Sequence, residues 1–399
     1  MKPLHIPSTP RDIASLGLAF LALIFIPILG TIIRYGGDVP ANFYEFPPLS
    51  VDSDPKAPFN IYVFSIIAIV CVFIVLLYLF PQWFGFKKVT ATAHIKAEKG
   101  RIPLWFWFGS LIFGGSLFFL WGIYSEPKWI VNWLLIPLFW GIIFIVDGIV
   151  YYRTRGTSLV GSKPQTLIAI AVCSVGGWLF FEFLNFFVHK NWFYPVGNLI
   201  SAEQFLLYSS IGSSALLTIV FEWYMLLKTF PKLAVKYTQG PQIEVPKKIW
   251  YYILFISLAS LFFIPYFPNQ LFFVIWLVPM TSLLSILHIR NMWTPFTPIM
   301  TKGNWAPLAL ICLSYFIQGF LYEFWNYFGA QHQADGTLLS YNPGYWVYSI
   351  PYVQKFHIFE MPILGLFGYL PFGLYCWTAW LIFSHMIGVN PNFDDSSEE

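Results

Sequence analysis

Charged residues are scarce in this sequence. Aspartate, glutamate, lysine and arginine together make up 10% of its 399 residues, whereas a soluble domain carries about 25%. Hydrophobic residues make up 57%, aromatic residues 21%, and the mean hydropathy is +0.65. This balance excludes an ordinary soluble globular protein and indicates an integral membrane protein.

Cysteine is also rare, and its placement excludes a disulfide scaffold. The four cysteines all fall inside apolar segments, without the spacing of metal ligands or of a disulfide framework, so they are expected to be small buried hydrophobic residues; they are Cys71, Cys173, Cys312 and Cys376. The net charge of +3 is small. Because the basic residues form short clusters between apolar runs, no nucleic-acid partner is expected.

Several common motifs are missing as well. The sequence contains no nucleotide-binding loop, no haem-type pairing of histidines within its apolar segments and no serine, histidine and aspartate set placed for acyl transfer. The cofactor therefore stays unknown. No small-residue cleavage site follows the apolar run from Ile13, so this run is expected to be a first membrane span and not a removable signal.

Ten apolar runs are long enough to be considered as membrane spans, which need about 20 residues each. They lie near 13–33, 61–84, 104–124, 130–152, 166–188, 205–227, 249–267, 270–289, 306–328 and 357–386. With the N-terminus inside, 17 of the 22 lysines and arginines fall on the inner side and five on the other. Since cytoplasmic loops carry the excess of basic residues, this asymmetry predicts ten spans with both termini in the cytoplasm; in a bacterium the membrane is then the inner membrane.

An internal duplication is visible in the second half of the sequence. The segment FEFLNFF at 181–187 recurs as YEFWNYF at 322–328, so that glutamate and asparagine repeat at a constant offset of 141. Downstream the offset becomes 154, and Trp192, Tyr194 and Trp223 correspond to Trp346, Tyr348 and Trp377. A single insertion in the second of the two loops explains the change of offset.

The resulting prediction is an all-α transmembrane bundle of about ten helices that contains two parallel four-helix repeats. Residues 1–103 form two leading helices with a Pro-rich outer loop and a basic inner loop, 104–228 the first repeat and 249–386 the second. Residues 387–399 form an acidic tail that is expected to be disordered. Because each repeat has an even number of helices, the repeats share one orientation, and a site between them takes residues from both.

Polar groups within apolar spans are costly and therefore mark the candidate site. They are Asp147, Glu182, Asn185, Glu222, His288, Gln318, Glu323, Asn326 and Glu360. Glutamate and asparagine in each copy are three residues apart and share a helix face, which His189 is expected to extend after the first copy. Glu360, preceded by His357, is expected near the outer start of the last helix.

These residues predict a carboxylate cluster that faces the outer leaflet. Glu182, Glu323 and Glu360 are the candidate catalytic residues; the candidate substrate-binding residues are Asn185, Asn326, Trp192, Trp346 and His357. One glutamate could stay protonated as a general acid while another stays ionised. Alternatively the glutamates could hold a metal ion with His189 or His357, or they could fix the packing of the bundle through hydrogen bonds.

The paired EFLN and EFWN segments, the tryptophans and tyrosines of the loops and the run FHIFEMPILGLFGYLPFG at 356–373 resemble a family of bacterial polytopic membrane proteins. The resemblance covers roughly residues 104–386 and implies no particular activity. The stretch YNPGY at 341–345, followed by FEMP at 359–362, is also similar to the membrane-embedded lycopene cyclases of carotenoid synthesis. That similarity implies a duplicated helical unit and an isoprenoid substrate, although only Glu360 stands where those enzymes carry paired acidic residues.

Three classes of function follow from the sequence. The first is a membrane-embedded enzyme or binding protein for a lipid or isoprenoid-type molecule. The second is a non-catalytic subunit that anchors or organises a larger membrane complex with protein partners. The third is a transporter, which ranks last because its ionisable groups are expected near the middle of the bilayer, whereas the carboxylates here are expected near helix ends.

Overall fold

The protein is described by a computed structural model that covers residues 9–41, 43–51, 56–89, 100–334 and 337–394. The long helices are α1 (Pro10–Tyr35), α2 (Ile61–Leu79), α3 (Leu104–Trp121), α5 (Leu135–Thr154), α7 (Pro164–Phe187), α8 (Ala202–Ser213), α9 (Leu216–Lys228), α11 (Lys247–Phe263), α12 (Val274–Ile289), α14 (Ala306–Phe328) and α15 (Tyr369–Ile387). Short helices are α4 (Lys128–Val131), α6 (Leu159–Ser162), α10 (Pro231–Lys236) and α13 (Thr297–Lys302), with 3-10 turns η1 (Pro81–Phe84), η2 (Gly197–Leu199), η3 (Ile264–Tyr266) and η4 (Gly365–Gly368). The predicted all-α fold is confirmed.

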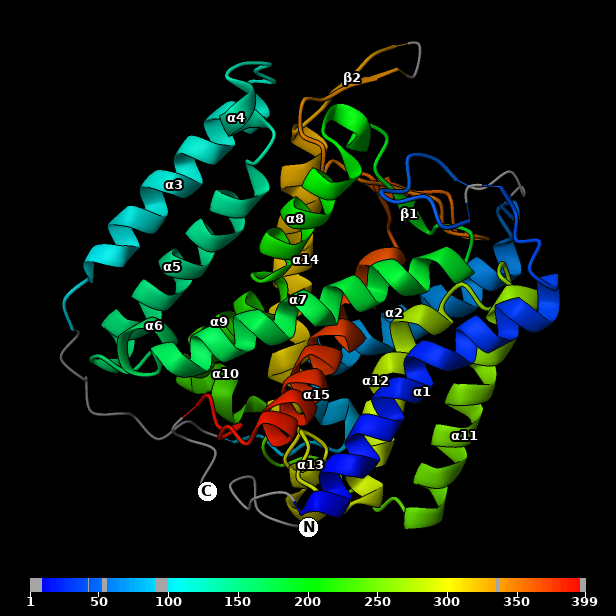
Figure 1. Cartoon of the computed structure of the whole chain (residues 1–399). Helices are drawn as coiled ribbons and strands as arrows, with labels where there is room; N and C mark the ends of the chain where they lie inside the picture. The colour runs from blue at the N-terminus through cyan, green and yellow to red at the C-terminus, as the bar shows by residue number, and fades with distance from the viewer. Residues whose placement is uncertain (1–8, 42, 52–55, 90–99, 335–336, 395–399) are drawn as a thin grey trace.

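Three two-residue antiparallel ladders lie together at one end of the bundle, which we call the loop end (Figure 1). They pair β1 (Trp192–Phe193) with β4 (Val347–Tyr348), β2 (Gln331–His332) with β3 (Leu338–Leu339), and β5 (His357–Ile358) with β6 (Met361–Pro362). α1 begins and α15 ends at the opposite end (Figure 1). Because α1 begins and α15 ends on the same side of the bundle, the arrangement agrees with an even number of membrane crossings.

Nine helical stretches within the described residues are long and apolar enough to cross a membrane, with α8–α9, α11–η3 and η4–α15 each counted as one stretch. The chain is therefore a multi-pass membrane protein. The run at 270–289 contains the shorter apolar helix α12, because residues 267–273 form bends and turns after Pro268. It supplies the remaining helix of the ten that the sequence predicts.

The last predicted span is wrong over its first part. Residues 357–364 form the β5–β6 hairpin and its exit, not helix, and α15 begins only at Tyr369. Pro362 disfavours helical backbone at the residue before it, and Phe359 has a φ of 59°, which a helix does not allow. Glu360 and His357 therefore lie in a hairpin at the loop end and not within a helix.

The sequence predicts a disordered tail at 387–399, but the structure places residues up to Asp394 against the bundle. Residues 395–399 lie outside the described residues. Phe393 is 3% exposed and packs on the rings of Phe221, Tyr224 and Trp377. Asp394 forms an ion pair with Lys228 of α9. Aromatic packing and this ion pair hold the segment against the bundle, which its polar composition alone does not suggest.

Helices at corresponding places in the two predicted repeats pack in the same order. In the first repeat α3 packs on α5, and in the second α11 packs on α12. In the same way, α5 packs on α9 and α12 packs on α15. Finally, α7 packs on α8 and α9, and α14 packs on α15. Across the two halves, α9 packs on α14 and α7 packs on α15. This reciprocal packing is what two parallel repeats related by an axis along the bundle require, and their common origin stays a prediction.

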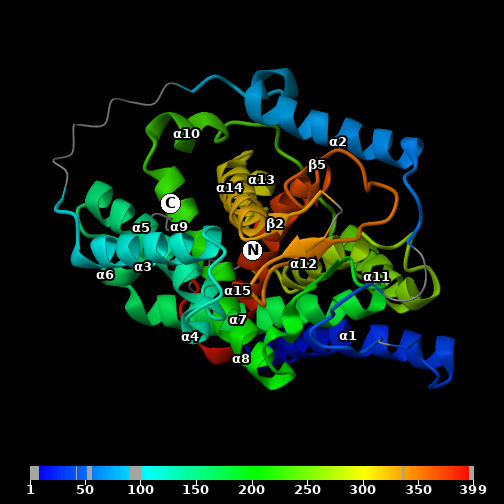
Figure 2. The same cartoon turned by 90° about the horizontal axis from the view of Figure 1, so that it is seen from above.

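The two leading helices differ in how they join the bundle. α1 packs on α11, α12 and α15, and its Asp12 carboxylate accepts a 2.7 Å ion-pair contact from Arg290 after α12. By contrast, α2 lies at the edge of the molecule (Figure 2), and Cys71 is the only buried residue of this helix. A helix that is apolar on all sides and largely exposed suits contact with lipid.

Candidate functional site

Glu182 of α7 holds the side chains of the loop that follows its helix. Its carboxylate accepts hydrogen bonds from the Trp192 indole Nε1 at 3.2 and 3.3 Å and from the Tyr194 hydroxyl at 2.5 Å. The glutamate is 4% exposed and its two partners are also buried. Burial and the neighbouring carboxylate raise the pKa of Tyr194 well above its usual range, so its hydroxyl stays protonated as a donor.

Asn185 lies one turn after Glu182 and holds the backbone of the same loop. Its Nδ2 donates to the Trp192 carbonyl at 2.8 Å, and its Oδ1 accepts from the Asn191 N–H at 2.7 Å. The predicted extension of this face by His189 is wrong. α7 ends at Phe187, and His189 follows in a left-handed conformation with a φ of 54°.

The second copy of the motif makes the same kinds of contact. Glu323 accepts from the Tyr348 hydroxyl at 2.7 Å and from the Tyr369 hydroxyl at 2.5 Å. Asn326 donates to the Trp346 carbonyl at 2.7 Å and accepts from the Trp346 N–H at 3.1 Å. In both copies, the glutamate therefore fixes aromatic side chains, and the asparagine fixes the backbone of the loop that carries at least one of them.

The two loops meet in the β1–β4 ladder. Trp192 is paired with Tyr348, and Phe193 with Val347. With the sequence offset of 154, Phe193 and Val347 are equivalent positions, so the ladder pairs a residue with its own counterpart. The ladder therefore joins the two loops that the two glutamate motifs hold.

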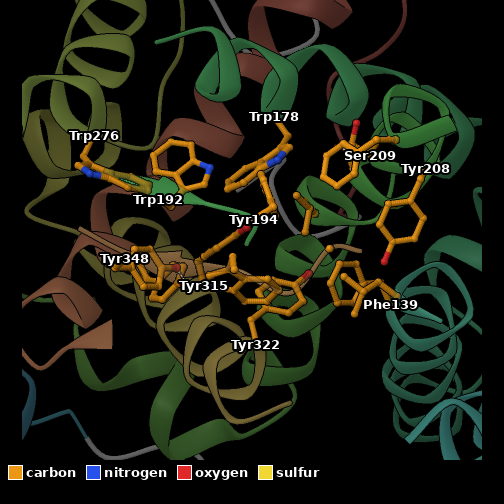
Figure 3. A pocket seen from close by; sticks show the side chains of 18 residues that line it. Phe139, Trp178, Trp192, Tyr194, Tyr208, Ser209, Trp276, Tyr315, Tyr322 and Tyr348 are labelled. Atoms are coloured by element: carbon orange, nitrogen blue, oxygen red, sulfur yellow. Dashed lines mark hydrogen bonds between the residues drawn. The ribbon is translucent and has the colours of Figure 1, made fainter. Parts of the chain in front are cut away.

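An aromatic cavity of about 100 Å³ lies between the two motifs (Figure 3). Its aromatic lining residues are Trp178, Trp192, Trp276, Trp346, Tyr194, Tyr208, Tyr315, Tyr322, Tyr348, Tyr369, Phe139 and Phe205. No aspartate, glutamate, lysine, arginine or histidine belongs to the described lining. The carboxylates of Glu182 and Glu323 thus lie behind the aromatic wall and reach the cavity through Trp192, Tyr194, Tyr348 and Tyr369.

Two orphan donors are found on this wall. The Trp346 indole Nε1 and the Tyr322 hydroxyl are buried and have no partner in hydrogen-bond geometry within the part of the chain that the structure describes, although Trp346 lies beside the Glu323 carboxylate and Tyr322 lies beside Gln318. By contrast, the hydroxyls of Tyr194, Tyr348 and Tyr369 each donate their one proton to a carboxylate. Toward the cavity these three offer oxygen lone pairs, and the wall therefore presents both donors and acceptors.

Glu360 lies outside this cavity, in a second polar group at the loop end. Its Oε1 accepts from the Tyr345 hydroxyl and contacts His332 Nε2 at 2.6 Å. Burial and the Glu360 carboxylate raise the pKa of Tyr345, so this phenol stays protonated. The adjacent backbone links the two groups, because Gly344 and Trp346 on either side of Tyr345 both line the cavity. His357 is exposed on β5 and does not line the cavity.

The remaining polar groups of the spans have local partners or none. Asp147 accepts from the Trp105 Nε1, the Ser158 hydroxyl and the Val160 N–H at 2.8–2.9 Å. The Glu222 carboxyl is buried beside Asp147, and neither of its oxygens has another hydrogen-bond partner in the described structure. No group of three or more histidine, cysteine, aspartate or glutamate side chains within the described ranges is placed to hold a metal ion.

The sequence pointed to the glutamates and to Trp192 and Trp346 of the aromatic wall, but not to the tyrosines that complete this wall. Tyr208, Tyr315, Tyr322 and Tyr369 lie within or beside apolar spans and line the cavity. A buried phenol hydroxyl is a polar group in an apolar span, so the argument applied to the glutamates could have found these tyrosines too.

Comparison of the chain with protein-family models, with curated proteins and with solved structures finds no match. Functional inference for this site therefore rests on its geometry.

Proposed function

We propose that this membrane protein binds a neutral lipid or isoprenoid-type molecule, with the compact polar or unsaturated part of the ligand in the aromatic cavity. The observation that supports this most is that two Glu–Asn motifs hold the aromatic wall of one cavity from both sides. A cavity of roughly 150 Å³ admits benzene in another protein, so a cavity of about 100 Å³ suits a group no larger than that, such as one isoprene unit or a hydroxyl head.

The lining favours an uncharged ligand group. A charged headgroup would be buried without a counter-ion, because the described lining contains no ionisable acid or base other than tyrosine. A hydroxyl or carbonyl group is complementary instead. It could accept from Trp346 Nε1 or the Tyr322 hydroxyl, and a hydroxyl could also donate to a tyrosine oxygen held by Glu182 or Glu323.

The predicted roles can be restated in these terms. Trp192 and Trp346 would contact the ligand, and Asn185 and Asn326 would position them. Glu182 and Glu323 act through their tyrosine partners, so a chemical role as acid would route a proton through a phenol. Glu360 with Tyr345 and His332, and the exposed His357 nearby, would lie at the loop-end approach to the cavity. With the basic residues facing the cytoplasm, that end faces the outer leaflet of a bacterial inner membrane.

A second candidate function is an integral subunit of a larger membrane complex. It is favoured by the way each Glu–Asn pair is bonded within the chain, since such contacts stabilise the bundle without any ligand. In this case the motifs hold the fold, and the protein partners bind elsewhere.

Purification in nanodiscs from the native membrane, followed by mass spectrometry of retained lipids and proteins, separates the two. We expect a stoichiometric neutral lipid on the wild type, lost from Glu323→Gln and kept by Glu203→Gln. Glu203 is an exposed residue of α8 and is the matched control. Stoichiometric protein partners with no retained lipid would contradict the proposal and support the complex subunit. Equal retention by both variants would show that the lipid binds away from the cavity.

A further inference from the structure

A larger apolar groove lies between α2 and the rest of the bundle. Its volume is about 790 Å³, and its walls come from α2, the start of α12, η4 and the loop around Ile350–Val353. Apart from Asn60, Gln270, Tyr352, Tyr369 and Trp276, its described lining is made of apolar side chains and glycine. Figure 2 shows α2 at the edge of the molecule, alongside the segment that carries β5.

α2 is fixed at its two ends. The backbone N–H of Asn60, which caps the helix, donates to the Tyr352 carbonyl at 3.0 Å. At the other end the Tyr78 carbonyl accepts from Lys236 Nζ at 2.6 Å and from the Tyr237 hydroxyl at 2.9 Å. Between these anchors, Ile66 and Val70 line the groove and are 64% and 53% exposed. The groove is therefore open to the bilayer along a helix that is held in place.

The groove and the aromatic cavity share two wall residues, Trp276 and Tyr369. On the cavity side, the Trp276 ring lies 5.3 Å from the Trp192 ring, and the Tyr369 hydroxyl donates to Glu323. Figure 3 shows Trp276 beside Trp192 at one edge of the cavity. A single layer of side chains therefore separates the two spaces, and one of these side chains is held by a glutamate of the motif.

We propose that the groove binds the single long apolar chain of the ligand, which enters sideways from the bilayer beneath α2 and places its head in the aromatic cavity past Trp276 and Tyr369. This inference rests on the proposed function and narrows the ligand to a single-chain neutral amphiphile, such as a prenyl alcohol or a prenylated ring. It assigns Trp276 and Tyr369 as the passage between the chain site and the head site.

The volume of the groove suits a lipid chain. The groove holds about 790 Å³, which is within the range of roughly 300–1,000 Å³ that is usual for small-molecule sites. Its described middle also offers few polar groups, which suits a hydrocarbon chain.

Gly368 allows the groove to be filled without disturbing the fold. A Cβ atom at this position would meet no atom within 4 Å, and the same is true of Gly114 on α3, which does not line the groove. We therefore compare Gly368→Phe with Gly114→Phe as the matched control. The probes are geranylgeraniol, whose chain is long enough to use the groove, and geraniol, whose chain is half as long.

We expect Gly368→Phe in nanodiscs to weaken geranylgeraniol binding by about tenfold, because the added ring displaces buried methylene groups, and to leave geraniol binding unchanged. Gly114→Phe should bind both probes as the wild type does. Equal binding of geranylgeraniol by all three proteins would overturn the groove as the chain site while leaving the head site standing. No binding of either probe by the wild type would instead count against the proposed function itself.

Cys71 gives a second measurement on the wild-type protein, independent of whether a variant folds. This cysteine lines the groove. Geranylgeraniol should slow its modification by N-ethylmaleimide, followed by peptide mass spectrometry, whereas geraniol should have little effect. A doubled mass or a co-purifying protein in the sample without added lipid would show that a protein covers the groove and would overturn the proposal.

Discussion

Asn326 ties the backbone of a long loop to α14 through both ends of one amide group. Its Nδ2 donates to the Trp346 carbonyl and its Oδ1 accepts from the Trp346 N–H, which is the bidentate contact that two extended backbones make with each other. An asparagine can satisfy both backbone groups at once, whereas aspartate lacks the donor and glutamine adds a methylene group. Asparagine at both 185 and 326 is therefore explained by the need for one donor and one acceptor on a short side chain.

Removing this amide should cost measurable stability. We expect Asn326→Ala to lower the free energy of unfolding by roughly 2 kcal/mol, because two hydrogen bonds are lost and buried backbone groups are left unpaired. Denaturant titration in detergent, followed by tryptophan fluorescence, measures the change. The exposed Asn198 provides the control variant Asn198→Ala, which should stay within a few tenths of a kcal/mol. Equal effects of the two variants would contradict a bonding role for Asn326.

At the scale of an element, the close approach of α3 and α5 depends on two facing glycines. A Cβ added to Gly141 would lie 2.9 Å from the Phe113 backbone N and 3.0 Å from the Gly109 carbonyl oxygen. Small residues at such crossings allow helix backbones to pack closely in membranes. The packing of this helix pair is therefore set by glycine and not by a polar contact.

We expect Gly141→Leu to destabilise the protein by about 1–3 kcal/mol, because the side chain must push α3 away from α5. Thermal unfolding in nanodiscs, read from intrinsic fluorescence, measures the loss. A Cβ on Gly115 of α3 would meet no atom within 4 Å, so Gly115→Leu should leave unfolding unchanged. If both variants behaved alike, the effect would come from leucine in the membrane and not from the crossing.

The sequence predicted the positions of the helices more accurately than the residues of the candidate site. Hydropathy found the helices because each crossing needs a long apolar run, but it could not place the start of α15, since apolar residues 356–364 fit a buried hairpin as well as a span. The motif at 182–185 and 323–326 was found by repetition alone. The cavity could not be found in this way, because its lining residues, such as Tyr208 and Trp276, come from helices far apart in the sequence and no local pattern encodes how those helices pack.

At the scale of the whole molecule, the segment after α15 closes the end of the bundle opposite the loop end. Phe393 packs on rings from α9 and α15, and the Trp380 indole donates to the Pro391 carbonyl at 2.8 Å. Residues 391–394 thus hold the first predicted repeat to the second.

We expect Phe393→Ala to lower the free energy of unfolding by roughly 3 kcal/mol, since a buried phenylalanine leaves a cavity when truncated. Phe25 of α1 is 60% exposed, and Phe25→Ala should have little effect. Denaturant titration of the two variants in the same detergent measures the difference. A small effect at Phe393 would show that the segment covers the bundle without stabilising it.

The β1–β4 ladder gives the single chain the contact geometry of a homodimer. In a two-fold dimer, residue i of one subunit meets residue j of the other and j meets i, and on the axis a residue meets its own copy. Here Phe193 meets its counterpart Val347 in this way. Because the two predicted repeats belong to one chain, their two sides need not be identical: Trp223 bonds Gln318 while Trp377 packs on the terminal segment, and Glu360 has no second glutamate opposite. A linked pair can thus offer one asymmetric molecule two different sides of the same cavity, which two identical subunits cannot do.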